Sequence, residues 1–128
     1  MVWLTVRNLR QLLGQKGEKK AASYLKKKGY KIVTANYKCH YGEIDLIAKY
    51  TDILIFIEVK TRTSTDFGGP AAAVDHRKQQ QISRVAHHYL VTHHNDDVDA
   101  RFDVISILSP NGKKTEIEHI IDAFEFSI

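Results

Sequence analysis

Acidic and basic side chains stand at regular intervals inside two apolar segments of the chain. Residues 42–48 read Gly-Glu-Ile-Asp-Leu-Ile-Ala, and residues 56–62 read Phe-Ile-Glu-Val-Lys-Thr-Arg. If these segments pair as a hairpin that turns at residues 51–52, Asp45 lies directly opposite Glu58. Four charged side chains then lie on one face of the hairpin: Glu43, Asp45, Glu58 and Lys60. The other face is expected to join the core with Ile44, Leu46, Ile57 and Val59.

Two facing carboxylates repel each other when both are ionised, because their Cβ atoms lie about 5 Å apart. Either one of them is protonated, or a cation lies between them. Mg²⁺ takes oxygen ligands and is commonly held by one or two carboxylates together with water and substrate phosphate. The ammonium of Lys60, on the same face, can hold a water or a phosphate oxygen beside such a metal. The pattern therefore predicts a site for metal-dependent hydrolysis of a phosphodiester bond.

The simpler alternative is a solvent-exposed charged face, which is the usual meaning of an isolated Glu-x-Lys sequence. Two observations favour a site. The charged residues are embedded in strongly apolar segments, and the register brings Asp45 and Glu58 together without adjustment. A slip of one residue would place them on opposite faces, so the prediction depends on the hairpin register.

The rest of the pattern predicts an α/β domain with a mixed sheet flanked by helices. Helices are expected over residues 8–28, ended by Gly29, and over residues 75–93. A stripe of small and apolar residues would let the first helix lie close to a sheet: Gly14, Gly17, Ala21, Tyr24 and Leu25. Strands are expected over 30–37, 43–50, 53–60, 101–108 and, as a candidate fifth, 114–120. Residues 61–74 are expected to form a loop and residues 110–113 a turn.

Composition limits the class of protein. The 128 residues carry a net charge of +4, which is compatible with a polyanionic partner. The lone cysteine, Cys39, excludes an internal disulfide framework and a cysteine-based zinc cluster. No apolar run approaches the roughly 18 residues of a membrane span, and the amino terminus lacks a signal-peptide pattern. We therefore expect no membrane association and a cytoplasmic location.

A larger set of ordered motifs runs from about Gly14 to Phe126 and resembles a known family. The motifs are Gly17-Glu18, Ala21, Tyr24-Leu25, Gly29-Tyr30, Asn36, residues 42–47, residues 56–62, Phe67-Gly68, Ala73-Val74, Lys78, Ala86, Tyr89-Leu90, residues 101–104 and Ala123-Phe124. They resemble the YraN family of small bacterial proteins, which are expected to be endonucleases. That family is similar to Holliday-junction resolvases of the PD-(D/E)xK, restriction-endonuclease-like superfamily.

The resemblance implies roles for particular residues. Asp45 and Glu58 match the two metal-binding acids, and Lys60 matches the motif lysine. Glu18 matches an acid on the first helix that reaches the metal site in resolvase-like proteins, and its alternative is an exposed helix acid. The proline of the superfamily name is absent, because Ile44 precedes Asp45. The catalytic set is therefore expected to be Asp45, Glu58, Lys60 and Glu18, with Mg²⁺ or Mn²⁺ held by the three acids.

Other polar residues carry weaker predictions. Arg62, Lys78 and Gln81 are candidates for DNA binding, although Lys78 can also extend into solvent. Glu43 is expected to pair with Lys60, with a role beside the metal as the alternative. The role of Asp103 is open between orienting Arg101 and orienting a strand end. The pairs His87-His88 and His93-His94 lack metal-site spacing, and the later pair is expected to mark a helix end.

The sequence thus favours one domain over residues 1–128, with a PD-(D/E)xK nuclease-like fold. Its expected function is metal-dependent endonucleolytic hydrolysis of DNA, with branched or damaged DNA as the candidate substrate. The resemblance also implies a homodimer. The alternatives are a module of the same fold that binds DNA or a protein without efficient cleavage, and a structural adaptor with a relic site.

Overall fold

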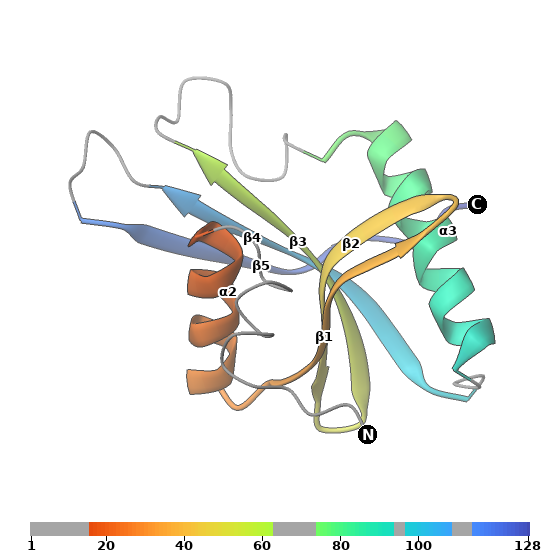
Figure 1. Cartoon of the computed structure of the whole chain (residues 1–128), viewed down its shortest axis with the longest axis horizontal. Helices are drawn as coiled ribbons and strands as arrows, with labels where there is room; N and C mark the ends of the chain where they lie inside the picture. The colour runs from red at the N-terminus through yellow and green to blue at the C-terminus, as the bar shows by residue number, and fades with distance from the viewer. Residues whose placement is uncertain (1–15, 63–73, 94–96, 109–113) are drawn as a thin grey trace.

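A computed structural model of the chain describes residues 16–62, 74–93, 97–108 and 114–128. Within these residues lie two helices, α2 (Lys16–Lys27) and α3 (His76–Thr92). The strands are β1 (Lys31–Cys39), β2 (Gly42–Tyr50), β3 (Ile53–Arg62), β4 (Asp99–Leu108) and β5 (Glu116–Phe124). They form one sheet in the order β1-β2-β3-β4-β5 (Figure 1). Only the β3–β4 pair is parallel, so the predicted mixed α/β sheet is confirmed and is compatible with a restriction-endonuclease-like fold.

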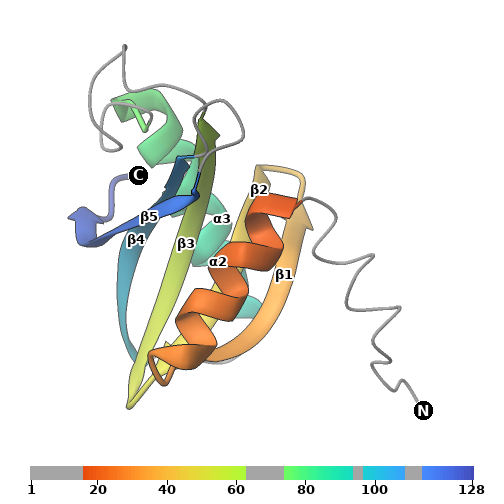
Figure 2. The same cartoon turned by 90° about the vertical axis from the view of Figure 1, so that its left-hand side faces the viewer.

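The two helices cover opposite faces of the sheet (Figure 2). Leu46 and Ile57 pack in the core cluster beneath α2, whereas Ile44 packs in the cluster beneath α3. The prediction of a single apolar face is therefore wrong, because both faces are buried and Ile44 turns away from Leu46. The change of face coincides with Asn36 of β1, whose left-handed backbone (φ 52°) interrupts the regular pleat opposite Asp45.

Helix α2 lies close to the sheet, as its small residues predict. Ala21 and Leu25 are fully buried, and a Cβ added to Gly17 would clash with Oγ1 of Thr61 at the end of β3. Gly29 ends the helix with left-handed backbone (φ 92°), and Tyr30 N–H donates back to the Leu25 carbonyl at 3.0 Å. The predicted helical residues 8–15, Gly14 among them, lie outside the described residues.

Helix α3 begins where the sequence predicts, because the Asp75 carboxylate accepts the Lys78 backbone N–H at 2.9 Å. The predicted apolar face is buried: Val74, Ile82, Val85, Ala86 and Tyr89. At the other end, the His93 N–H donates to the Tyr89 carbonyl and its ring stacks on Tyr89, so His93 is a helix-end residue. His94 lies outside the described residues, as do most of the predicted loop 61–74 and the turn 110–113.

A buried ionic network joins β4 to β5. Asp103 is fully buried, and its carboxylate accepts hydrogen bonds from Arg101 at 2.9 and 3.2 Å. The ring of His119 lies 2.7 Å from the same carboxylate, which also accepts the Asp122 backbone N–H at 3.0 Å. Asp103 therefore orients both Arg101 and a strand end. Strand β5 continues to Phe124, beyond its predicted end, through Asp122 in left-handed conformation.

None of the helices in the described parts of the chain is both long and apolar enough to cross a membrane.

Candidate active site

The predicted hairpin register is confirmed along the half of the hairpin nearest its turn. Backbone pairing runs from Tyr50–Ile53 to Leu46–Ile57, one step before Asp45 and Glu58. There β2 and β3 diverge, β2 toward α3 and β3 away from it (Figure 1). Beyond the last pair, the Asp45 carboxylate accepts the Val59 backbone N–H at 2.8 Å. A side chain of β2 thus bonds the β3 backbone at the point where regular strand pairing ends.

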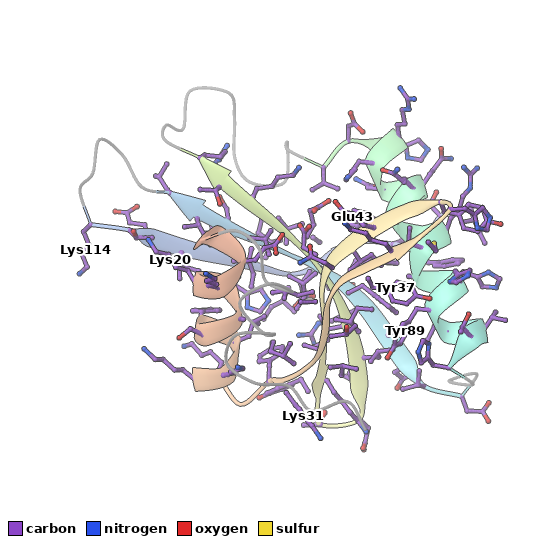
Figure 3. All side chains as sticks on the ribbon, in the orientation of Figure 1. Lys20, Lys31, Tyr37, Glu43, Tyr89 and Lys114 are labelled. Atoms are coloured by element: carbon purple, nitrogen blue, oxygen red, sulfur yellow. The ribbon has the colours of Figure 1, made fainter. Side chains whose placement is uncertain are left out.

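The divergence of the strands leaves a cavity of about 300 Å³. Both helices and both strands contribute to its lining, which includes Glu18, Glu43, Asp45, Glu58, Lys60 and Lys78. Three of these are the acids, and one the lysine, that the sequence predicts to act together. Figure 3 shows Glu43 on β2 at this end of the sheet. The structure therefore gathers the four predicted catalytic side chains around one cavity and adds Lys78 from α3.

Glu58 is the most deeply buried acid of the cavity, with a side chain only 8% exposed. Burial raises its pKa to about 8, and the hydrogen bond with Asp45 and the charge of Asp45 act in the same direction. The ammonium groups of Lys78 and Lys60 act in the opposite direction, and Lys78 Nζ lies 3.6 Å from Glu58 Oε2. Without a bound metal, Glu58 is therefore expected to be largely protonated at neutral pH.

Replacing Glu58 with glutamine is expected to stabilise the metal-free protein at alkaline pH. Between pH 4.5 and about 8 the unfolded chain releases the Glu58 proton and the folded chain keeps it, so wild-type stability falls as pH rises. The charged groups facing it are Asp45, Lys60 and Lys78. Over this pH range, the free energy of unfolding of the wild-type protein falls by at most about 5 kcal/mol. Urea unfolding with a chelator should show a gap between the two proteins that is small near about pH 5 and grows toward about pH 9. A gap that does not change with pH would contradict the assignment.

Glu18 reaches the cavity from α2, so it is not an exposed helix acid. The Asn36 side-chain amide donates to its carboxylate at 3.2 Å. Burial raises the pKa of Glu18, the Asn36 hydrogen bond lowers it, and the charges of Asp45 and Glu43 raise it. The net effect is a raised pKa. A third acid therefore lines the cavity from the side of α2.

Sequence comparison identifies the family to which the chain belongs. The profile of the group described as "Uncharacterised protein family UPF0102" matches residues 17–107, a range that contains every predicted catalytic residue. A UPF0102 protein of Caldanaerobacter subterraneus is 48% identical over 117 residues, covering 90% of this chain and 96% of the relative. A UPF0102 protein of Syntrophus aciditrophicus is 44% identical over 128 residues, covering 99% of this chain and 98% of the relative. The chain belongs to the UPF0102 family.

Some predicted residues of this UPF0102 chain lie away from the cavity. Gln81 is exposed, and its amide donates to the Tyr41 carbonyl at 3.2 Å. Arg62 is the last residue of β3 and lies outside the described cavity lining. The predicted pairing of Glu43 with Lys60 is wrong, because Glu43 forms its ion pair with Lys38, at 3.8 Å. Lys38 lies directly opposite Glu43 on the adjacent strand β1, and both side chains are exposed.

No role was predicted for Asn36, although it bonds Glu18. The sequence indicates this role only weakly. An asparagine within a strand points to an irregular position only when its backbone is known to be left-handed, as it is at Asn36. The approach of Lys78 to Glu58 was also beyond prediction from sequence. It depends on how α3 packs against β3, which no local pattern specifies.

The donor set of this UPF0102 protein fits a hard divalent cation through two carboxylates. Glu58 Oε2 is buried without a hydrogen-bond partner, and Asp45 faces it. In the described part of the chain, no three His, Cys, Asp or Glu side chains are arranged as a metal-binding cluster. Mg²⁺ and Mn²⁺ accept this arrangement, because water and substrate phosphate complete their coordination. Glu18 lines the same cavity and stays a predicted further ligand.

Proposed function

We propose that this UPF0102 protein is a metal-dependent endonuclease that hydrolyses phosphodiester bonds in DNA. The observation that carries the proposal is the pairing of Asp45 with the buried Glu58 in a cavity that also receives Lys60. A buried carboxyl beside a second acid lowers the stability of the folded protein. We therefore expect the pair to serve a function. Perturbed acids that converge in a cleft are typical of active sites.

Asp45 and Glu58 would hold Mg²⁺ or Mn²⁺. The bound metal supplies Lewis-acid stabilisation of the phosphate charge and a lower pKa for water. Lys60 orients the attacking water and donates hydrogen bonds to the phosphate oxygens as negative charge grows there. The water loses a proton to the solvent as its oxygen forms a new bond to phosphorus. The bridging P–O bond breaks, and the leaving oxygen departs with the electron pair and takes up a proton from the solvent. Lys78 Nζ lies 3.6 Å from Glu58 Oε2 and lowers the pKa of that carboxyl, and Glu18 is available as a further acid.

The proposal includes DNA as the partner, with branched or damaged DNA as the candidate substrate. The net charge of +4 favours a polyanion. It also includes a homodimer, which would present two cavities to two strands, and a cytoplasmic location.

A DNA-binding module without efficient cleavage is the second candidate. The position of Lys78 favours it, because an ammonium group already lies 3.6 Å from the acid that would bind the metal. Within the described residues, the acids are also not assembled as a cluster of three ligands. A module of this kind would bind DNA with strong salt dependence and leave it intact.

The test is a cleavage assay on single-stranded, duplex, nicked and branched DNA with Mg²⁺, with Mn²⁺ and with chelator. Wild-type protein should cleave at least one substrate only when metal is present. Asp45→Asn should abolish cleavage, because it removes the charge while its amide oxygen still accepts the Val59 N–H. Asp52→Asn makes the same change at the exposed hairpin turn and should leave cleavage unchanged. DNA binding without metal-dependent cleavage of any substrate would establish the second candidate instead.

A further inference from the structure

A second, larger cavity lies beside the candidate active site. It measures about 600 Å³ and is formed by the first half of α3 and the β1–β2 turn. A cavity of about 380 Å³ lies against both, since it shares Glu43 with the active-site cavity and Gln81 with the larger one. Lys78 lines all three. The three cavities therefore adjoin one another from Glu58 along α3, and together they are here called the α3 groove.

The far end of the α3 groove is positively charged. Its lining includes Arg77, Lys78 and Arg84 and one acid, Asp75. The Asp75 carboxylate caps α3 by accepting the Lys78 backbone N–H, so part of its charge is already engaged. The surface is therefore suited to a ligand with repeated negative charges, which a nucleic-acid backbone has.

An exposed aromatic ring on the β1–β2 turn lines the same end of the α3 groove. Tyr41 is 44% exposed, and the ring of His40 lies beside it at a centroid distance of 3.9 Å. The turn that carries them is held in place, because Gln81 donates to the Tyr41 carbonyl at 3.2 Å. Gly42 packs so closely on Gln81 that an added Cβ would lie 2.7 Å from its amide nitrogen.

The β1–β2 hairpin behind this turn is also fixed against α3. The rings of Tyr37 and Tyr89 meet edge to face at a centroid distance of 5.1 Å (Figure 3). The Tyr37 hydroxyl lies 2.7 Å from Nδ1 of His88. Tyr41 is thus an exposed ring on a rigid support, which lowers the entropy cost of binding a planar group.

We propose that the α3 groove binds a single-stranded segment of the DNA substrate that flanks the scissile phosphate. A base stacks on Tyr41, and Arg77 and Arg84 contact the adjacent phosphates. A base within a duplex has both faces covered by its neighbours, so an exposed ring beside a basic groove selects unpaired bases. The inference rests on the proposed function, because it assigns the substrate of that same site.

The test compares two fluorescent DNA hairpins of identical stem, one blunt and one with an oligothymidine tail. Binding is followed by fluorescence anisotropy in EDTA, so that cleavage does not contribute. Wild-type protein should bind the tailed hairpin more tightly. Tyr41→Leu should weaken binding of the tailed hairpin by roughly five- to hundredfold and leave the blunt one unchanged, whereas Tyr41→Phe should keep the preference.

The charge arm of the test uses Arg84→Gln with Lys31→Gln as its control. Lys31 is exposed at the start of β1, away from the groove (Figure 3). Arg84→Gln should reduce the salt slope for the tailed hairpin by about 0.7, and Lys31→Gln should leave it unchanged. Equal wild-type affinity for both hairpins, or a preference that survives Tyr41→Leu, would overturn the inference. Neither result depends on cleavage, so the proposed nuclease activity is judged separately.

Discussion

Lys60→Met is expected to lower the rate of DNA cleavage by about 10²- to 10³-fold, the usual cost of losing one preorganised donor to the reacting group. Lys60 lines the cavity beside Asp45 and Glu58, and its ammonium is the group placed to stabilise charge on the phosphate. Both proposed metal ligands remain in the variant. The loss should therefore fall on the chemical step and leave DNA binding within a fewfold of wild type.

The measurement is single-turnover cleavage at saturating protein, with affinity taken separately from anisotropy in chelator. Lys31→Met is the matched control, because it removes the same charge from an exposed position on β1. Titrating Mn²⁺ in each protein separates a chemical defect from weakened metal binding. A parallel loss of affinity and rate in Lys60→Met would show that this lysine holds DNA and does not act on the reacting phosphate.

The sequence was sufficient to predict that Asp45 and Glu58 lie close together, because the short turn at residues 51–52 sets the register of the hairpin. Once Tyr50 is set against Ile53, the positions of Asp45 and Glu58 follow from strand geometry. The end of α2 and the start of α3 were also predictable, because Gly29 ends α2 and Asp75 caps the start of α3 through local hydrogen bonds. These features depend on residues close together in the chain.

The parts that the sequence did not predict depend on how distant elements pack. Lys78 falls on the apolar side of α3. Its contact with Glu58 depends on where α3 lies relative to β3, which the sequence does not specify. The left-handed Asn36 coincides with the change of face at Ile44, and its side-chain amide bonds Glu18. An alternating pattern assumes a regular pleat, so it fails where the strand is irregular. Those irregularities lie at the candidate site, where strain is commonly found.

Asp103→Asn is expected to lower the free energy of unfolding by about 3–5 kcal/mol, the usual cost of removing one partner from a buried ion pair. Asp103 is fully buried and accepts from Arg101, from the Asp122 N–H and, at 2.7 Å, from the ring of His119 when that nitrogen carries a proton. An amide has one acceptor oxygen in place of two and no charge. Arg101, whose guanidinium is largely buried and also donates to the Tyr30 hydroxyl, would lose its compensating anion.

The pH dependence distinguishes this network from ordinary packing. Burial alone would raise the pKa of Asp103, but hydrogen bonds from His119, Arg101 and Asp122 outweigh it and hold the pKa below its ordinary value of 3.8. The network therefore stabilises the fold above about pH 4, and that contribution is lost as the pH falls through the native pKa. Urea unfolding should show the largest gap between wild type and Asp103→Asn near neutral pH and a smaller gap in acid. Asp99→Asn changes an exposed acid on the same strand and should cost less than about 0.5 kcal/mol. If Asp103→Asn costs no more than this control, β5 is held to β4 by its backbone pairing and apolar contacts, without help from the buried charges.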